Sequence, residues 1–255
     1  MAFHLSDLRT GLKPFRLHWF PRLRSTNDHA AALRKRGQLY APAVVLTGHQ
    51  LAGRGRGSNA WWSGAGSLTV TFVFAAEEHL APYHVPLLAG LAVRNAASAL
   101  VANDAVQLKW PNDLQFEGRK LAGLLCERVH KADLVGLGLN VNVERRQIPA
   151  ALRDSVTSLS EIAGRDFELT EVVTMIAKHL HGALSHRDEQ SFAAAMREYD
   201  CHHALVGKRV SVIGGGDGSG VSGKCEGLDE MGRLILRDGR TLHRVIAGHV
   251  QLSQR

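Results

Sequence analysis

The stretch VQLKWPNDLQFEGRKLAGLLCERV, residues 106–129, decides the fold because short apolar runs alternate with turns along it. Val106–Lys109 predicts a short strand, and Pro111 forces a turn directly after it. The pair Gly118-Arg119 then makes a tight connection into a longer apolar run, Lys120–Val129. Strands that follow one another through tight turns pair antiparallel, so this stretch predicts part of a mostly antiparallel sheet.

On both sides of this stretch the pattern predicts further strands and helices. Apolar runs rich in β-branched residues predict strands at Ala43–Thr47, Leu68–Phe74 and Leu134–Val143. Capping residues or helical spacing of apolar residues predict helices at Asp28–Arg36, Val85–Val101, Leu169–Leu184 and Ser191–Tyr199. Residues 1–24 are mixed and contain prolines that break regular structure. The expected fold is α+β, with helices segregated around the sheet.

The C-terminal part of the chain has a different pattern. Short β segments separated by glycine and aspartate turns are expected at Arg209–Ile213, Val221–Leu228, Arg233–Leu236 and Thr241–Ile246. About fifty residues of short strands predict a small β-barrel. We therefore expect two domains, residues 1–203 and residues 204–255.

Composition and charge restrict the class of protein. Hydrophobic residues make up 45% of the 255 residues and charged residues 22%, as in ordinary globular proteins. No apolar run approaches the ~18 residues that span a membrane, and the N-terminus does not resemble a signal peptide, so a cytoplasmic location is expected. The net charge of +7 is spread along the chain, which makes it a weak indication of nucleic-acid binding.

The most informative loop is Gly53-Arg54-Gly55-Arg56-Gly57, which continues to Trp61. Glycine lets backbone N–H groups approach a ligand, and arginine offers a planar fork that fits phosphate or carboxylate. The loop therefore predicts a site for an anion such as a nucleotide or an acyl-adenylate. Alone, it could equally be a mobile surface loop or a weak nucleic-acid patch.

A second group of polar residues follows a predicted strand end. Lys109-Trp110-Pro111-Asn112-Asp113 places a cation, an aromatic ring, an amide and a carboxylate within one turn. Asp113 could help to hold Mg²⁺, which prefers oxygen ligands. Lys120 could reach a carboxylate or phosphate as a point charge. Taken singly, a self-satisfied turn and a solvent-facing lysine remain open alternatives.

The order of these motifs closely resembles the biotin–protein ligase family. Their sequence along the chain is Ser25-Thr26-Asn27, Gln50 with Gly53–Arg56 and Trp61, Lys109–Asp113, Lys120-Leu121-Ala122-Gly123, and Gly136-Leu137-Gly138-Leu139-Asn140-Val141-Asn142. The resemblance covers nearly the whole chain. It implies a catalytic domain related to class II aminoacyl-tRNA synthetases, followed by a small Src-homology-3-like barrel. It also implies ATP-dependent formation of biotinyl-5′-AMP and biotin transfer to a lysine of a biotin carboxyl carrier domain.

The resemblance also implies roles for individual residues. Biotin would contact Ser25, Thr26, Asn27, Gln50, Arg54, Gly55, Arg56 and Lys120. The catalytic groups would be Lys120, Arg54 and Arg56, which offset negative charge in the transition state. ATP would contact Gly53, Trp61, Asn112, Asn140 and Asn142, and Asp113 would hold Mg²⁺.

The chain departs from the family pattern at one place. Many members continue the loop with Gly-Arg where this sequence has Ser58-Asn59, so the anionic site loses a potential arginine. The family's DNA-binding winged helix would not fit in the residues before Ser25, and we expect no operator-binding repressor function. A monomer and a homodimer both remain possible.

Two other functions compete with this interpretation. A lipoate–protein ligase shares the catalytic fold and adenylation chemistry, but the Gly-Arg loop and the terminal barrel favour biotin. A non-enzymatic biotin-sensing or nucleic-acid-binding protein could use the charge and the glycine run Gly214–Gly220. That run lacks a following helix and is better interpreted as a hairpin loop. The spacing of the three cysteines and fourteen histidines predicts no metal site.

Overall fold

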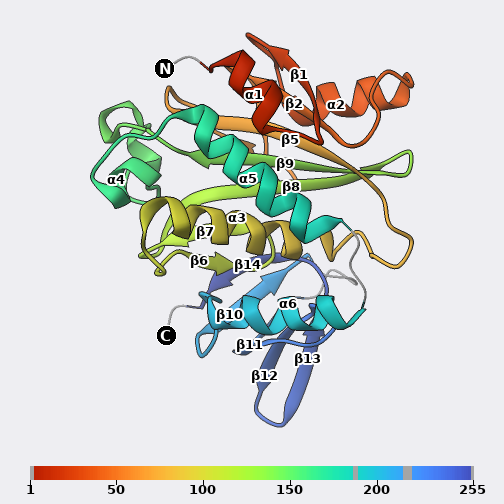
Figure 1. The fold of residues 1–255 in the computed structure, drawn as a ribbon. Coiled ribbons are helices and arrows are strands. Elements are labelled where there is room, and N and C mark those ends of the chain that lie inside the picture. The colour runs from red at the N-terminus through yellow and green to blue at the C-terminus, as the bar shows by residue number, and fades with distance from the viewer. Residues whose placement is uncertain (1–2, 186–188, 215–219, 254–255) are drawn as a thin grey trace.

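A seven-stranded sheet forms the centre of the computed structural model, which describes residues 3–185, 189–214 and 220–253 (Figure 1). In sheet order its strands are β1 (Arg16–Phe20), β2 (Ala43–Thr47), β5 (Ser67–Ala75), β9 (Ala132–Asn140), β8 (Arg119–Val129), β7 (Asp113–Phe116) and β6 (Gln107–Lys109). β1 and β2 pair parallel, and each of the other neighbours pairs antiparallel. The predicted mostly antiparallel sheet is therefore confirmed.

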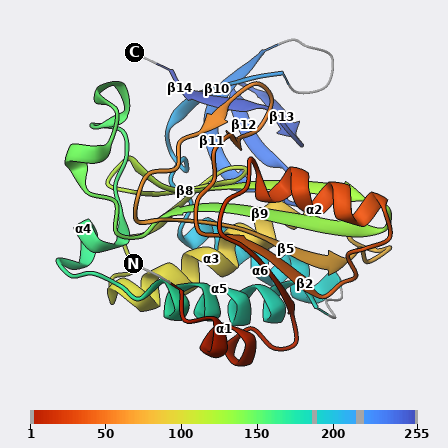
Figure 2. The ribbon, with the colours of Figure 1, turned by 90° about the horizontal axis from the view of Figure 1, so that it is seen from above.

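Helices cover the two faces of this sheet unequally. One face carries α1 (Leu5–Gly11), α3 (Val85–Val101) and α5 (Leu169–Leu184), while α2 (Thr26–Lys35) lies on the other (Figure 2). α4 (Leu159–Ala163) and two short 3-10 helices, Arg145–Gln147 and Ala150–Leu152, lie in the connection between β9 and α5. α6 (Glu189–Cys201) contacts α3 and the C-terminal strands. The face that carries α2 therefore has fewer helices than the opposite face.

The inner strands are continuous apolar runs because they are buried on both faces. In β2, Val44 and Leu46 pack into the core under α3 and α5, whereas Val45 packs into the smaller core under α2. All residues of β2 and β9 are buried. A sheet held on both sides in this way is a rigid platform for functional groups.

The C-terminal segment forms a separate five-stranded antiparallel sheet. Its order is β13 (Thr241–Val245), β12 (Leu234–Asp238), β11 (Val221–Leu228), β10 (Arg209–Ile213) and β14 (His249–Leu252). The glycine run interpreted as a hairpin loop lies largely outside the described residues, since 215–219 are not described. His202 and Ala204, in the connection between α6 and β10, form backbone hydrogen bonds with Leu108 of the large sheet, so this connection is fixed to that sheet.

Several elements differ from the sequence-based expectation. Residues 1–24, expected to be irregular, contain α1 and the edge strand β1, and β14 was not predicted. The strand expected to extend to Val143 ends at Asn140, because the next residues bond to the backbone of Gly66. α2 begins at Thr26, where the Ser25 hydroxyl accepts a hydrogen bond from the Asp28 backbone. Among the described residues, no helix is long and apolar enough to cross a membrane.

Candidate active site

A cavity of about 480 Å³ opens on the α2 face of the large sheet. The Gly-Arg loop, here residues 53–61, covers it and lies between α2 and the C-terminal strands (Figure 2). This loop contains the two-stranded ribbon of β3 (Gly53–Arg54) and β4 (Ala60–Trp61). Residues of α2, β8, β9, β14 and the turn between β6 and β7 complete the lining.

Glycines on the cavity floor let large side chains lie directly on the sheet. A Cβ at Gly138 would overlap the indole ring of Trp61, and a Cβ at Gly136 would overlap the side-chain amide of Asn27. Both glycines belong to β9, and their neighbours across the sheet are in β8 and β5. The repeated glycines of this strand thus set the depth of the cavity.

A polar wall stands at the start of α2. The Gln50 side-chain oxygen accepts hydrogen bonds from the Thr26 backbone N–H at 2.9 Å and from the Thr26 hydroxyl at 3.3 Å. The Thr71 hydroxyl donates to the Asn27 side-chain oxygen at 2.6 Å. Ser25, Thr26 and Asn27 are all buried. Their hydroxyl and amide groups are therefore fixed in orientation before any ligand contact.

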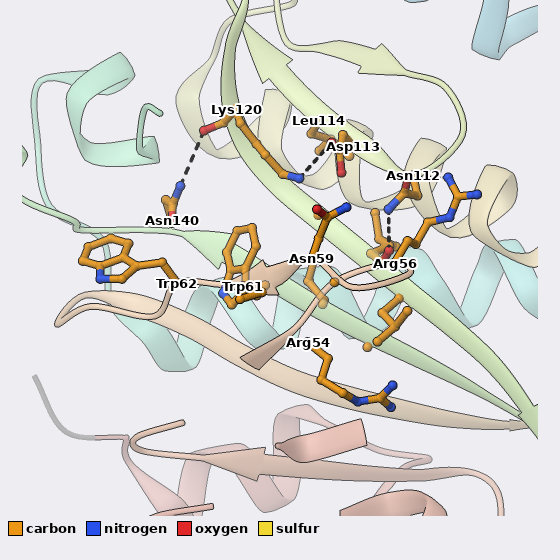
Figure 3. A pocket seen from close by; sticks show the side chains of 18 of the residues that line it. Arg54, Arg56, Asn59, Trp61, Trp62, Asn112, Asp113, Leu114, Lys120 and Asn140 are labelled. Carbon is orange, nitrogen blue, oxygen red and sulfur yellow. Dashed lines mark hydrogen bonds and ion pairs between the residues drawn. The ribbon is translucent and has the colours of Figure 1, made fainter. Parts of the chain in front are cut away.

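A cationic wall of the same cavity is formed by Lys120 and Arg56 (Figure 3). Lys120 Nζ lies 2.8 Å from a carboxylate oxygen of Asp113. Arg56 Nη1 donates to the Asn112 side-chain oxygen at 3.3 Å and to the Gly248 carbonyl at 3.2 Å. Burial lowers the pKa of the Arg56 guanidinium, although the charge of Asp113 partly opposes this. A partly buried cation held by neutral acceptors is well suited to receive an anion.

Arg54 behaves differently from Arg56, although the two alternate in one motif. Its guanidinium points away from Lys120 and Asp113 (Figure 3) and pairs with Asp28 at 2.7 Å and Glu127 at 2.9 Å. Burial lowers the Arg54 pKa, but these two carboxylates outweigh burial and the net shift is upward. The charge of Arg54 is therefore already compensated within the protein.

Three buried polar atoms in the cavity lining have no hydrogen-bond partner among the described residues. They are Trp61 Nε1, Asp113 Oδ1 and Asn140 Oδ1. The other atoms of two of these groups are engaged, since Asn140 Nδ2 donates to the Thr157 carbonyl at 3.1 Å and Asp113 Oδ2 pairs with Lys120. Buried polar groups are almost always hydrogen-bonded, so the free atoms indicate a ligand with both donors and acceptors.

The comparisons with known proteins agree with this geometry. A model described as the biotin/lipoate A/B protein ligase family matches residues 19–144. The biotin–[acetyl-CoA-carboxylase] ligase of Mycobacterium tuberculosis is 31% identical over 232 residues, covering 89% of this chain and 85% of that protein. The chain belongs to the biotin protein ligase family.

Further members of the biotin protein ligase family match over similar lengths. The biotin–[acetyl-CoA-carboxylase] ligase of Paracoccus denitrificans is 29% identical, over 84% of this chain and 92% of its own. The Aquifex aeolicus biotin protein ligase, solved in complex with biotin and ATP, superposes with a TM-score of 0.82 at 29% identity. That match covers 94% of this chain and 99% of the other.

The structure brings most of the predicted biotin protein ligase residues together. Those that line the cavity are Ser25, Thr26, Asn27, Gln50, Arg54, Gly55, Arg56, Trp61, Asn112, Asp113, Lys120 and Asn140. Gly53 is not part of the lining, and it packs against the backbone of Trp61. Asn142 is also outside the lining, because its side-chain amide bonds both to the carbonyl and to the N–H of Phe167.

Some cavity residues were not predicted as site residues. Trp62, Lys109 and His249 line the cavity, and so does Asn59, which stands where many biotin protein ligases have arginine. Lys109 could have been found, since it begins the Lys109–Asp113 motif. His249 gives no sequence signal, because only the packing of the C-terminal sheet places it beside the Gly-Arg loop.

Proposed function

We propose that this protein is a biotin–protein ligase that activates biotin with ATP to biotinyl-5′-AMP and transfers it to a protein lysine. The supporting observation is a cavity that combines a fixed polar wall, a cationic wall and a floor of glycines. One wall suits a neutral ureido ring, and the other suits a carboxylate and a phosphate. Joining two anions requires this charge compensation more than it requires a covalent enzyme intermediate.

The polar wall is proposed to bind the biotin ring. The Ser25 hydroxyl accepts a hydrogen bond from the backbone, which leaves its O–H free to donate to a ligand carbonyl. Thr26 is held by the Gln50 side-chain oxygen, and the Thr71 hydroxyl bonds to both Thr26 and Asn27. Because these groups are preorganised, little conformational entropy is lost when the ligand binds.

The cationic wall is proposed to stabilise the reacting carboxylate and α-phosphate. Lys120 and Arg56 enter the cavity from β8 and from the Gly-Arg loop. Trp61 would cover the nucleotide side, with Lys120 Nζ 5.8 Å from its ring centre. Arg54, predicted as a catalytic group, would instead hold the loop in place through Asp28 and Glu127.

The carboxylate of Asp113 fits a magnesium ion. Its buried Oδ1 has no partner among the described residues, and Mg²⁺ commonly binds one protein carboxylate together with substrate phosphates. When bound, the ion would neutralise phosphate charge on ATP. No group of three or more His, Cys, Asp or Glu side chains forms a metal site in the described part of the chain. The ion would therefore depend on the nucleotide for most of its ligands.

The acceptor is proposed to be a biotin carboxyl carrier domain of a carboxylase. This assignment follows the relatives, whose names specify acetyl-CoA carboxylase. We also propose the finer features of the fold expected from the sequence, namely a class II synthetase-like domain at residues 1–203 and a Src-homology-3-like barrel at residues 204–255. This division is supported by the order of the strands, because those of the seven-stranded sheet all precede α6 and those of the five-stranded sheet all follow it.

The function is tested by streptavidin-detected transfer of biotin to a purified carrier domain, with ATP and Mg²⁺ omitted in turn. Lys120→Ala is expected to lower the transfer rate by about 100- to 1000-fold, the usual cost of losing one transition-state contact. The matched control is Lys178→Ala, an exposed lysine on α5. ATP–pyrophosphate exchange that depends on lipoate and not on biotin would refute the proposal.

A further inference from the structure

Glu127 on β8 lies behind the cavity, where three elements of the site meet. Its Oε2 accepts a hydrogen bond from Asn27 Nδ2 of α2 at 2.8 Å. Arg54 Nη2 of the Gly-Arg loop donates to the same carboxylate, at 3.0 Å to Oε1 and 2.9 Å to Oε2. Glu127 is not among the residues that line the cavity. One side chain thus connects the polar wall to the Gly-Arg loop, although it does not itself line the cavity.

The chemistry of this junction requires a carboxylate. Asn27 and Arg54 both present N–H donors, and an ionised carboxylate only accepts. In a glutamine at this position, the single side-chain oxygen could accept from Asn27 or from Arg54. The NH₂ group would then face the N–H of the other residue, and two donors cannot form a hydrogen bond. The second donor of Asn27 is already used by the Leu125 carbonyl at 2.9 Å. Asn27 therefore cannot turn away to relieve that conflict.

Asp28 completes the junction on the side of the loop. It pairs with Arg54 at 2.7 Å and is about half exposed, while Glu127 is one-third exposed. Exposed ion pairs add little to the stability of a protein. The ordering of Asn27, which also packs over Gly136 on the cavity floor, is a separate effect, to which Glu127 contributes a hydrogen bond and Asp28 does not. Stability and site geometry can therefore be tested independently.

We infer that Glu127 is a positioning residue for biotin, because its carboxylate fixes Asn27 and the Gly-Arg loop relative to each other. This inference rests on the proposed function, since it assigns biotin to the polar wall. Glu127 sets the separation between that wall and the covering loop. The biotin affinity of the site then depends on a group that does not touch biotin.

The test compares Glu127→Gln with two variants in the full-length protein. Asp28→Asn loosens Arg54 but leaves the Glu127–Asn27 contact in place. The matched control Glu226→Gln removes a similar carboxylate–arginine pair, to Arg237, on the C-terminal sheet. Biotin affinity is measured by calorimetry, and exposure of the loop is measured by the rate of trypsin cleavage after Arg56. Thermal melting reports whether each variant is folded.

Glu127→Gln is expected to weaken biotin binding by roughly tenfold, as for one lost charge-assisted hydrogen bond, and to accelerate cleavage. In turnover, the KM for biotin should rise while the KM for ATP stays unchanged, which a general loss of stability would not produce. Asp28→Asn should accelerate cleavage with wild-type biotin affinity, and Glu226→Gln should change neither quantity. If Glu127→Gln does not fold, Glu127→Asp, which keeps the charge but shortens the side chain so that it cannot reach both donors, takes its place in the same measurements.

Wild-type biotin affinity in Glu127→Gln would overturn the inference, whatever happens to cleavage. Failure of the proposed function would be recognised separately, from the biotin affinity of the unaltered protein. If the unaltered protein binds no biotin but cleavage responds to Glu127→Gln, the ligase assignment and the biotin role both fail, and the anchoring of the loop by Glu127 remains.

Discussion

Gly138 determines where the ring of Trp61 lies, and this relation can be tested with a single methyl group. Gly138→Ala is expected to displace the indole, because the added Cβ would overlap it. Overpacking typically costs about 1–3 kcal/mol, so the KM for ATP should rise at least about fivefold. Titration of ATP in pyrophosphate exchange measures this change.

The control for Gly138→Ala is Gly182→Ala on α5, where an added Cβ meets nothing within 4 Å. Alanine is favoured over glycine in a helix by roughly 0.5–1 kcal/mol, so this control should melt slightly higher with an unchanged KM for ATP. An unchanged KM in Gly138→Ala would mean that Trp61 does not contact the nucleotide.

The residue types of the site were predictable from the sequence, but their partners were not. Arg54 and Arg56 are equivalent in the motif, and yet one pairs with Asp28 and Glu127 while the other enters the cavity. The difference arises because Arg54 belongs to the short ribbon of β3 and β4, whereas Arg56 lies in the turn between these strands and is not held to the same face. Asn142 likewise has the residue type of a ligand contact, but it bonds to Phe167, which is distant in sequence. Such pairings depend on the tertiary fold.

At the scale of elements, β14 links the C-terminal sheet to the active site. The Gly248 carbonyl before this strand accepts a hydrogen bond from Arg56 at 3.2 Å, and His249 lines the cavity next to it. His249→Ala is expected to raise the KM for ATP by about 2- to 10-fold, the effect of one modest hydrogen bond. The affinity for biotin should not change, because Ser25, Thr26 and Asn27 lie on the other wall. Steady-state kinetics with each substrate varied measures both quantities.

The matched control for His249→Ala is His243→Ala, on β13 of the same sheet and outside the cavity lining. Equal effects of the two substitutions would show that His249 acts through the stability of the sheet. A larger rise in the KM for biotin than in the KM for ATP would show that His249 lies near biotin and not near the nucleotide.

The success of prediction for each element follows its burial. β2 and β5 were predicted closely, because strands buried on both faces need continuous apolar runs. β1 and β14 were missed, because half-exposed edge strands mix polar and apolar residues without a clear period. The helices α3 and α5 have long apolar stripes and were found with their correct ends. Position at an edge alone is not decisive, because the edge strands β6 and β13 were predicted from the turns that bound them.

At the scale of the whole molecule, His84 joins the two halves of the structure. It stands at the start of α3, 7% exposed, and its ring stacks on Phe192 of α6 with ring centres 4.2 Å apart. Nearby, Gly232 of the C-terminal sheet packs against Leu87 of α3 and against Phe192. The packing of α6 between α3 and the C-terminal sheet therefore includes a titratable ring.

Burial lowers the pKa of His84 below its ordinary value of 6.5, and a hydrogen bond that the ring donates to the backbone carbonyl of Met231 partly offsets this. The neutral ring is thus favoured in the folded state, while the unfolded chain takes up a proton near pH 6.5. Stability from this group is fully present above pH 6.5 and is lost as the pH falls through that value toward the lower folded pKa. Acidification should loosen the contact between α6 and α3.

His84→Phe keeps a stacked ring that cannot be charged, and it should flatten the loss of stability in acid. The melting temperature of His84→Phe relative to wild type is therefore expected to rise steadily between pH 7.5 and pH 5.5, as measured by circular dichroism. His79→Phe, at an exposed position in the same connection before α3, is the control and should keep a constant difference. A difference for His84→Phe that does not vary with pH would show that His84 does not couple protonation to the packing of the two sheets.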